Sequence, residues 1–514
     1  MGLAHVPAYP TFIAAAFVLY EHAMSTSPLE YVARPLVVAI LVAVVVQIVM
    51  SLTLSSVHRG SFIAMALLWT IIGRPVLALI MVGAFVAGAV IAHRRQIGLE
   101  RMPWRTFTGA MNAIAAINLV LVMAISHGAG GLDFAHEEWD APRGVAAPGA
   151  PDIYLIMLDG YPRSDTAMSE FQLDNRPFLA TMESMGFDVA TRSHSNYNAT
   201  VLTVASMMTG AHVLPQLADL PDSAPRQYRA LSRLINSGAG LRPFRAAGYE
   251  VVSVPSAYPD ASLLSADRVV DQGYLNYFEI RLLSAGILRP ILGEPIWENY
   301  RSSIKAEFNA LVDLANERTT TPKIVFSHVL VPHMPIAFTR TGASAQPLPC
   351  YPLRCQLSAF GDEYGDTLLD PMRQQLEWVN SEVERTTRAI QERSLSPPAI
   401  VVFSDHGMRN DASNVDEMFR SFFMAATPGH PRLFPESVSP VTILARLARA
   451  YAGTPVPLSS EESYVIDTRR PDGDVLIGLE RWPLDKGGRN QDPIDVDTSI
   501  RSRWTNQRAV SARP

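Results

Sequence analysis

The sequence contains little charge and few cysteines. Asp, Glu, Lys and Arg make up 18% of its 514 residues, against about 25% in soluble domains. Between Glu30 and Glu100 there is no acidic residue and no lysine. The net charge of −6 argues against a general nucleic-acid binder, which would show a basic patch or stripe. Two cysteines in a chain of this length exclude a small disulfide scaffold.

The N-terminal part of the chain contains several long apolar runs. Several approach the roughly 20 residues needed to cross a bilayer, and their repetition is unlike a single cleaved signal peptide. We expect a transmembrane bundle over residues 1–126 with five spans, although a count of four also fits. The expected spans are residues 10–22, 35–55, 61–72, 75–92 and 107–126.

Arginines between the runs predict the orientation of the bundle. The loop 93–105 carries Arg94, Arg95, Arg101 and Arg105, and the turn at Arg59 is also basic. Positively charged loops stay in the cytoplasm, so the last span should exit on the outer side of the cytoplasmic membrane. We expect a linker at 127–150, an extracytoplasmic domain at 151–480 and a disordered polar tail at 481–514.

The two cysteines, Cys350 and Cys355, fall in the outer domain. Two cysteines this close in an oxidising compartment most simply form a local disulfide. The alternative, half of a metal site, would need two further ligands, and neither a CxxC motif nor a nearby histidine accompanies the pair. We therefore predict the disulfide.

The outer domain shows the rhythm of an α/β fold. Apolar runs at 153–158, 250–254, 323–330 and 399–403 alternate with helix-like stretches, which predicts a mostly parallel central sheet covered by helices. Ligands collect at the carboxyl ends of such strands. Asp159 follows the first run, and the pair Asp405-His406 follows the last.

Each of these polar pairs also has a simpler interpretation. Asp159-Gly160 can be only a turn, and Asp405-His406 can be a helix cap beside a surface histidine. Their matching positions on two strands favour a shared metal site. Gly407 would allow the chain to turn so that neighbouring side chains point the same way.

A candidate nucleophile stands at the start of a buried helix. A polar loop at 193–199 precedes an apolar stretch that runs from Thr200 to about Gly210. Backbone N–H groups at a helix N-terminus favour negative charge, which suits a hydroxyl that attacks phosphate or sulfate. The alternative is that Thr200 serves only as the N-cap.

Together these motifs resemble the sulfatase and alkaline-phosphatase superfamily over residues 151–463. Residues Pro151–Gly160 resemble the first metal-binding strand of this superfamily, and Thr200–Gly210 resemble its nucleophile helix. Val401–Gly407 resemble its late metal-binding strand. The membrane bundle with an outer catalytic domain resembles lipoteichoic acid synthases and lipid A phosphoethanolamine transferases. Membrane sulfatase-like proteins with Leu-Asp-Gly-Tyr-Pro-Arg and Pro-His-x-Pro motifs are also similar, here at 158–163 and 332–335.

The resemblance implies roles for individual residues. It implies that one divalent cation, Mn²⁺, Mg²⁺ or Zn²⁺, is held by Asp159, Thr200, Asp405 and His406, with Thr200 also the nucleophile. His333 would contact the substrate oxygens or protonate the leaving group, unless it is only a loop histidine between prolines. Asn196, Asn198 and Arg163 are candidates for contact with the substrate anion. His328, in an apolar strand, is expected to be a packed core residue.

The chain also departs from family patterns. Formylglycine sulfatases need Cys or Ser in a Cys/Ser-x-Pro-x-Arg context, whereas this chain has Thr200-Val201-Leu202-Thr203-Val204. No histidine follows His406 until His430, which leaves the second zinc of alkaline phosphatases without its ligands. The resemblance therefore implies one metal and no formylglycine.

We expect a transfer of a phosphoglycerol or phosphoethanolamine head group from lipid, through a phosphothreonine-type intermediate. The expected partners are the membrane and a lipid or envelope-glycan substrate. A sulfate-ester or phosphodiester hydrolase with the same site is an alternative. An alternative from another class is a non-catalytic membrane-anchored binding protein, since fold alone does not fix function.

Overall fold

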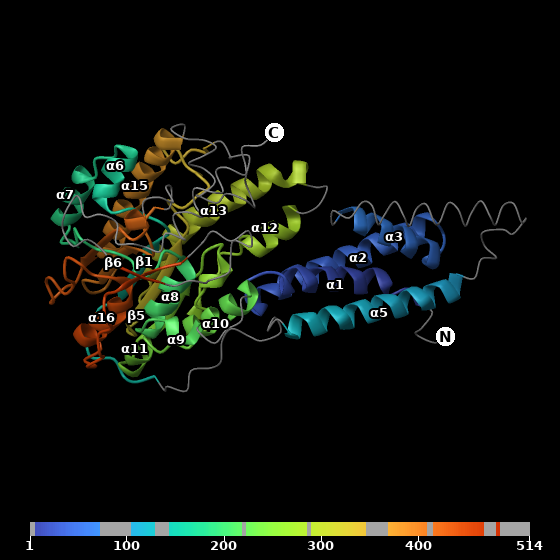
Figure 1. Cartoon of the computed structure of the whole chain (residues 1–514), viewed down its shortest axis with the longest axis horizontal. Coiled ribbons are helices and arrows are strands. Elements are labelled where there is room, and N and C mark those ends of the chain that lie inside the picture. Colours follow the sequence, from blue (N-terminus) through green and yellow to red (C-terminus); the bar gives the residue numbers. More distant parts are fainter. Residues whose placement is uncertain are drawn as a thin grey trace, which may run out of the picture.

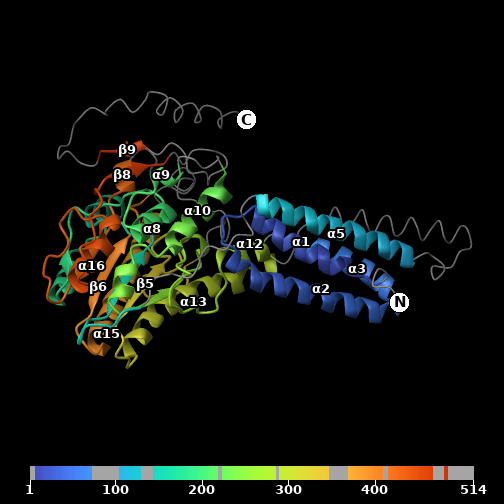
Figure 2. The same cartoon turned by 90° about the horizontal axis from the view of Figure 1, so that it is seen from below.

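The computed structural model describes residues 6–71, 104–128, 143–217, 223–284, 289–345, 368–408, 415–466 and 480–483. It shows a globular α/β domain with a group of long helices that projects from one side (Figures 1 and 2). Cys350 and Cys355 lie outside the described residues, so their disulfide stays a prediction.

The projecting helices cover four of the five expected spans. They are α1 (Tyr9–Ala23), α2 (Ala33–Thr53), α3 (Val57–Ile71) and α5 (Trp104–Gly128), and the short helix η2 (Leu29–Val32) leads into α2. The expected span at 75–92 lies outside the described residues. By length and composition, two helical segments in the described chain can cross a membrane, Leu29–Thr53 and Trp104–Gly128. In the most apolar 18 residues of each helix, only 6% and 17%, respectively, are buried within the protein. The core helices of a soluble domain are mostly buried.

The outward faces of these helices are apolar. On α2, Val37, Leu41 and Leu52 are 55%, 58% and 75% exposed. On α5, Ile117 and Val120 are exposed by 60% and 64%. Exposed apolar surface of this extent marks a contact with a membrane or with another protein. The expected lipid environment would cover this surface.

A seven-stranded sheet forms the centre of the globular domain. Its strand order is β2-β7-β6-β1-β5-β3-β4. Four of the strands are β1 (Ile153–Leu158), β3 (Glu250–Val254), β5 (Lys323–Val329) and β6 (Ala399–Ser404). These pair in parallel, as does β4 (Arg268–Val269) with β3. β7 (Phe423–Ala426) and β2 (Asp188–Val189) pair antiparallel at one edge. The mostly parallel sheet predicted from the sequence is confirmed.

The register of the central strands places their carboxyl ends together. Leu158, the last residue of β1, is paired with Val329 of β5 and with Ser404 of β6. The residues that follow β1 and β6 therefore leave the sheet at the same edge. Those residues are Asp159 and the Asp405-His406 pair.

Helices cover both faces of the sheet because its buried strands are apolar on both sides. Alternate residues of β1 enter separate hydrophobic clusters, with Tyr154 and Ile156 in one and Ile153 and Leu155 in the other. The first cluster is completed by α6 (Ser164–Phe171), α7 (Arg176–Ser184), α13 (Arg289–Asn316) and α15 (Leu369–Arg393). The second is completed by α8 (Thr200–Thr209), α10 (Ala224–Asn236), α11 (Arg242–Ala246) and α16 (Ile443–Tyr451).

The remaining elements are short. They are α9 (Leu214–Leu217), α12 (Tyr277–Ser284), the 3₁₀ turns η4 (Pro259–Ala261), η7 (Val415–Met418) and η8 (Pro440–Thr442), and the antiparallel pair β8 (Ser463–Val465) and β9 (Glu480–Trp482). Arg481 and Trp482, which the sequence placed in a disordered tail, form part of β9. Residues 484–514 lie outside the described chain.

Polar contacts attach the membrane-side helices to the globular domain. Arg34 of α2 binds both carboxylate oxygens of Glu279 on α12. Thr26 Oγ1 donates to Asp260 Oδ2 at 2.9 Å, and Tyr31 OH donates to Ser262 Oγ at 2.8 Å. These contacts join the segment from Thr26 to Arg34 to the chain between Asp260 and Glu279.

Candidate metal centre

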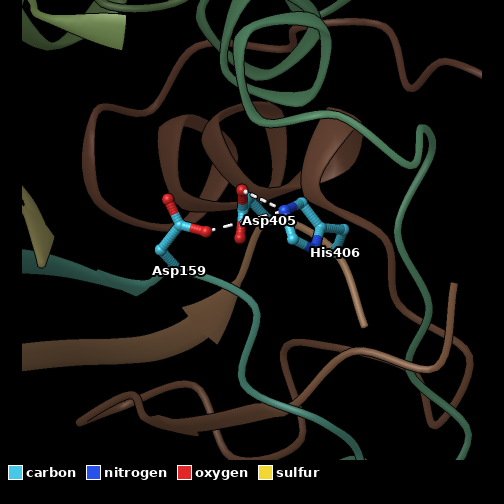
Figure 3. A group of neighbouring side chains, drawn as sticks. All are labelled: Asp159, Asp405 and His406. Atoms are coloured by element: carbon cyan, nitrogen blue, oxygen red, sulfur yellow. Dashed lines mark ion pairs between the residues drawn. The ribbon is translucent and has the colours of Figure 1, made fainter. Parts of the chain in front are cut away.

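Asp159, Asp405 and His406 meet at the carboxyl ends of β1 and β6 (Figure 3). One ligand atom from each lies within 4.8 Å of the others. His406 Nε2 is 3.5 Å from Asp159 Oδ1 and 3.3 Å from Asp405 Oδ2. In the part of the chain that the structure describes, this is the one group of three such residues spaced to hold a metal ion.

The two carboxylates fit a cation site because one oxygen of each lacks a partner. Asp159 is 3% exposed and Asp405 is fully buried. Among the described residues, neither Asp159 Oδ1 nor Asp405 Oδ2 accepts a hydrogen bond. Buried carboxylate oxygens without donors are costly unless a cation faces them. These are also the oxygens nearest to His406.

The other oxygen of Asp405, Oδ1, is contacted by Gly160 and Ser404. Gly160 N–H donates to Asp405 Oδ1 at 3.0 Å, and Ser404 Oγ lies 3.4 Å from the same atom. Gly160 has φ of +69°, and a Cβ on it would lie 3.3 Å from the ring of His406. The backbone at Gly160 therefore approaches the site in a conformation that suits glycine.

The ring of His406 is oriented by its own backbone. Nδ1 lies 2.7 Å from the carbonyl oxygen of Gly407, and because a carbonyl only accepts, Nδ1 carries the proton. In the neutral ring Nε2 then holds the lone pair. A partner on the other nitrogen is the usual way in which a metal-binding histidine is oriented.

Thr200 lies at the same centre and does not cap its helix. The N-cap of α8 is Ala199, in extended conformation, and Thr200 is the first helical residue. No side-chain capping hydrogen bond is made at this end. Thr200 Oγ1 instead lies 3.4 Å from His406 Nε2. The hydroxyl is thus directed to the cluster of candidate metal ligands.

His328 has a role that the sequence did not reveal. It is buried, as expected of a core residue, but its Nε2 lies 3.0 Å from Asp159 Oδ2. Its Nδ1 is 3.2 Å from Ser256 Oγ, and that oxygen accepts a hydrogen bond from Tyr258 N–H. The carboxylate requires a donor, so Nε2–H binds Asp159 and Nδ1 accepts from the Ser256 hydroxyl. The only sequence signal was a histidine within the predicted strand at 323–330.

His333 lies beside the cluster. Its ring centroid is 6.4 Å from that of His406, and its backbone N–H donates to the carbonyl of Asp159 at 2.9 Å. Its Nδ1 donates to the carbonyl of Met334 at 2.6 Å, so Nε2 is the nitrogen that would exchange a proton. The peptide bonds that precede Pro332 and Pro335 are both cis.

Asp159 is held in its charged form by these histidines. Burial by itself would raise the pKa of the carboxyl. The imidazoles of His333, His328 and His406 outweigh it and hold the pKa of Asp159 below its usual value. An ionised Asp159 is the form that binds a cation.

The three expected anion contacts have other partners in this structure. The Asn196 side chain binds Ser439 Oγ at 3.0 Å and the backbone of Val441 at 2.9 Å. The Asn198 side chain accepts from Ile466 N–H at 2.9 Å. Arg163 pairs with Asp165 at 2.6 Å. Contact of these side chains with substrate therefore stays a prediction, and the two asparagines clearly fasten the loop before α8 to later segments.

No protein-family model and no curated protein matches the sequence. Solved structures similar to the chain include three enzymes. One is the soluble domain of lipooligosaccharide phosphoethanolamine transferase A from Neisseria meningitidis, with 12% identity, a TM-score of 0.38, and coverage of 68% of this chain and 99% of that chain. Another is phosphonate monoester hydrolase of Agrobacterium radiobacter, with 11% identity, a TM-score of 0.40, and coverage of 63% and 82%. The third is a 2-O GAG sulfatase, with 14% identity, a TM-score of 0.44, and coverage of 70% and 91%.

All three TM-scores are below 0.5. The functional assignment therefore rests on the residues of this chain.

Proposed function

We propose that this chain is a membrane-anchored, metal-dependent enzyme that transfers a phosphoryl-linked head group from lipid, with Thr200 as the nucleophile. The observation that carries the proposal is the convergence of Thr200 Oγ1 with two unpartnered carboxylate oxygens around His406 Nε2. A capping or purely structural threonine has no reason to face such a group. Asp159, Thr200, Asp405 and His406 would hold one divalent cation, Mn²⁺, Mg²⁺ or Zn²⁺.

A divalent cation at this position would lower the pKa of the Thr200 hydroxyl and neutralise charge on the phosphoryl oxygens. The Thr200 oxygen attacks phosphorus, so that a Thr200 O–P bond forms as the bond to the lipid alcohol breaks. The Thr200 hydroxyl gives up its proton as its oxygen attacks, and the leaving alcohol oxygen takes one. In this proposal His333 Nε2 accepts the first proton and passes it to the leaving oxygen. A second hydroxyl then attacks the phosphothreonine and loses its proton, while the bond from phosphorus to Thr200 breaks and the Thr200 oxygen takes a proton back.

Individual residues of the chain assist this reaction. Thr200 occupies the first position of α8, so backbone N–H groups of the first helical turn face negative charge that develops there. His328 holds Asp159 through one carboxylate oxygen and leaves the other directed at His406. The ionised Asp159 and the oriented ring of His406 are therefore ready for a cation before substrate arrives.

The membrane helices make lipid a physically reasonable donor. We propose that residues 1–126 form the bundle and that 151–480 form the catalytic domain on the outer side of the cytoplasmic membrane. The contacts between Arg34 and Glu279 and between Tyr31 and Ser262 hold the domain against the bundle. The donor would carry phosphoglycerol or phosphoethanolamine.

Mass spectrometry of the purified full chain tests the proposal. After incubation with Mn²⁺ and phosphatidylglycerol or phosphatidylethanolamine vesicles, wild type should gain a phosphoglycerol or phosphoethanolamine adduct, and Thr200→Ala should not. Thr209→Ala, at the other end of the same helix, should keep the adduct. Metal binding without any adduct, combined with turnover of chromogenic sulfate or phosphodiester esters, would favour a hydrolase. An absence of metal binding would favour the non-catalytic binding protein.

A further inference from the structure

A second site is suggested by a cavity of about 260 Å³ where the membrane-side helices meet the globular domain. Glu30, Tyr31 and Arg34 line it from η2 and the start of α2. The facing wall comes from the chain between β3 and α12 and from Ser303 and Glu307 of α13. At about 30 Å³ per water in the liquid, this space holds a small organic group or roughly nine waters.

The wall of this cavity is acidic. Four carboxyl side chains line it, from Glu30, Asp271, Glu279 and Glu307, and Arg34 is its single Lys or Arg. The guanidinium of Arg34 is already engaged with Glu279 and with the carbonyls of Gly273 and Tyr274, at 3.2 and 2.7 Å. The cavity therefore disfavours an anion and favours a cation.

Glu307 supplies an observation independent of this charge count. Its side chain is 1% exposed, and within the described chain its Oε2 accepts no hydrogen bond. Burial raises the pKa of Glu307 well above its usual value. A glutamate placed in a cavity wall with an unpartnered oxygen destabilises the fold unless a water or a ligand satisfies it.

The spacing of the carboxyl groups argues against a metal ion. Ca²⁺ and Mg²⁺ require several oxygens within about 2.6 Å of one centre. In the described chain, the single cluster with metal-like spacing is Asp159, Asp405 and His406. The cavity carboxyls are too dispersed for chelation, whereas an ammonium group carries three N–H donors on an organic stem that can fill the remaining space.

We propose that this cavity binds the protonated primary amine of a small molecule or of a lipid head group, with Glu307 as the buried counter-ion. This site is separate from the proposed metal centre and its existence does not depend on the reaction there. A free amine and an aminolipid head group share this chemistry.

Binding of an amine at Glu307 should release a proton. The carboxyl is favoured in its neutral form by burial, and an adjacent ammonium favours the ionised form. The glutamate proton therefore leaves when the ammonium enters. A group that only supports the fold would show no such release.

Isothermal titration of the full chain in detergent with ethanolamine tests the proposal. We expect saturable binding, with a proton release that appears as a difference in heat between buffers of different ionisation enthalpy. Glu307→Gln should weaken binding by about tenfold or more, as loss of a buried charge partner does, and should abolish the proton release. Glu294→Gln, an exposed site on the same helix, should match wild type.

Asp271→Asn, at an exposed position of the wall, gives a second variant that need not disturb packing and should weaken binding several-fold. Choline, which has no ammonium N–H, should bind poorly. The proposal is overturned if ethanolamine does not bind, if both variants bind like wild type, or if choline binds equally well. Competition by Mg²⁺ or Ca²⁺ that disappears in Glu307→Gln would assign a metal site and also overturn it.

Nanodiscs distinguish the two sources of amine. If phosphatidylethanolamine nanodiscs weaken the apparent affinity for ethanolamine relative to phosphatidylcholine nanodiscs, the site takes a lipid head group. Equal affinities assign it to a free amine. The metal-centre variant Thr200→Ala should bind ethanolamine like wild type, so failure of the proposed transferase reaction and failure of this site give different results.

Discussion

Thr200 Oγ1 lies 3.4 Å from His406 Nε2, although 206 residues separate the two in sequence. The contact joins the first residue of α8 to the turn after β6. It brings the candidate nucleophile to the two carboxylates that neighbour His406. The predictions that follow test what this arrangement does.

Removal of the Thr200 hydroxyl should abolish catalysis and preserve the fold. We expect Thr200→Ala to lower turnover by about 10³-fold or more, as loss of a nucleophile does. Thr200→Ser, which keeps the hydroxyl, should retain measurable turnover. Activity on phospholipid vesicles and thermal unfolding of each variant check this. An active Thr200→Ala protein would remove the nucleophile from the proposal.

Metal should stabilise wild type through Asp405. Within the described chain, one oxygen of each buried aspartate lacks a donor and can face a cation. A cation bound there stabilises the folded state by about 2.7 kcal/mol at a concentration 100 times Kd. Addition of Mn²⁺ to chelator-treated protein should raise the Tm of wild type and not of Asp405→Asn. Asp188→Asn, at an edge strand, should respond like wild type. An equal rise in all three proteins would locate the metal elsewhere.

His328 should act as a positioning residue for Asp159. His328→Phe fills similar space and removes the donor to Asp159 Oδ2. Loss of such an outer partner typically weakens metal affinity by about 10- to 100-fold. Ser256→Ala, one hydrogen bond further away, should have a smaller effect. Titration with Mn²⁺ measures both affinities, and an unchanged affinity in His328→Phe would leave His328 as a core residue only.

Glu307 should make stability depend on pH in a defined direction. Burial raises its pKa above the usual 4.5, so between the unfolded and folded pKa values the native state binds more protons and stability falls as pH rises. Glu307→Gln removes this dependence. The Tm of the variant should exceed that of wild type at pH 7, and the difference should shrink as pH falls toward 4.5. Tm measured from pH 4 to 8 tests this, and a variant less stable than wild type at pH 7 would contradict it.

Local sequence predicted a large part of the fold. The apolar runs of the N-terminal part predicted helices that the structure contains at α1, α2, α3 and α5. Alternation of apolar strands with helical stretches predicted the parallel sheet, because buried parallel strands are apolar on both faces. Asp159 and the pair Asp405-His406 were identifiable because they follow apolar strands, at the carboxyl ends where ligands of such sheets collect.

Contacts between residues far apart in the chain could not be predicted from the sequence. Nothing local distinguishes His328, in a buried apolar strand, from a core histidine, and its bond to Asp159 depends on the pairing of β5 with β1. Asn196 and Asn198 lie close to Thr200 in sequence and could have contacted a substrate anion. Their side-chain amides instead bind the backbone of Val441 and Ile466. Hydrogen-bond partners more than 200 residues away have no signature in a local motif.

The sequence by itself determined which segments are apolar enough for membrane or core, and which strand ends carry carboxylates, imidazoles and a hydroxyl. These follow from local composition and periodicity. Tertiary structure alone decided that Thr200 faces His406 and does not cap its helix, that His328 holds Asp159, and that Glu307 faces a cavity beside Arg34. Each of these depends on strand register and helix packing, which bring together residues whose separation along the chain gives no information about their distance in space.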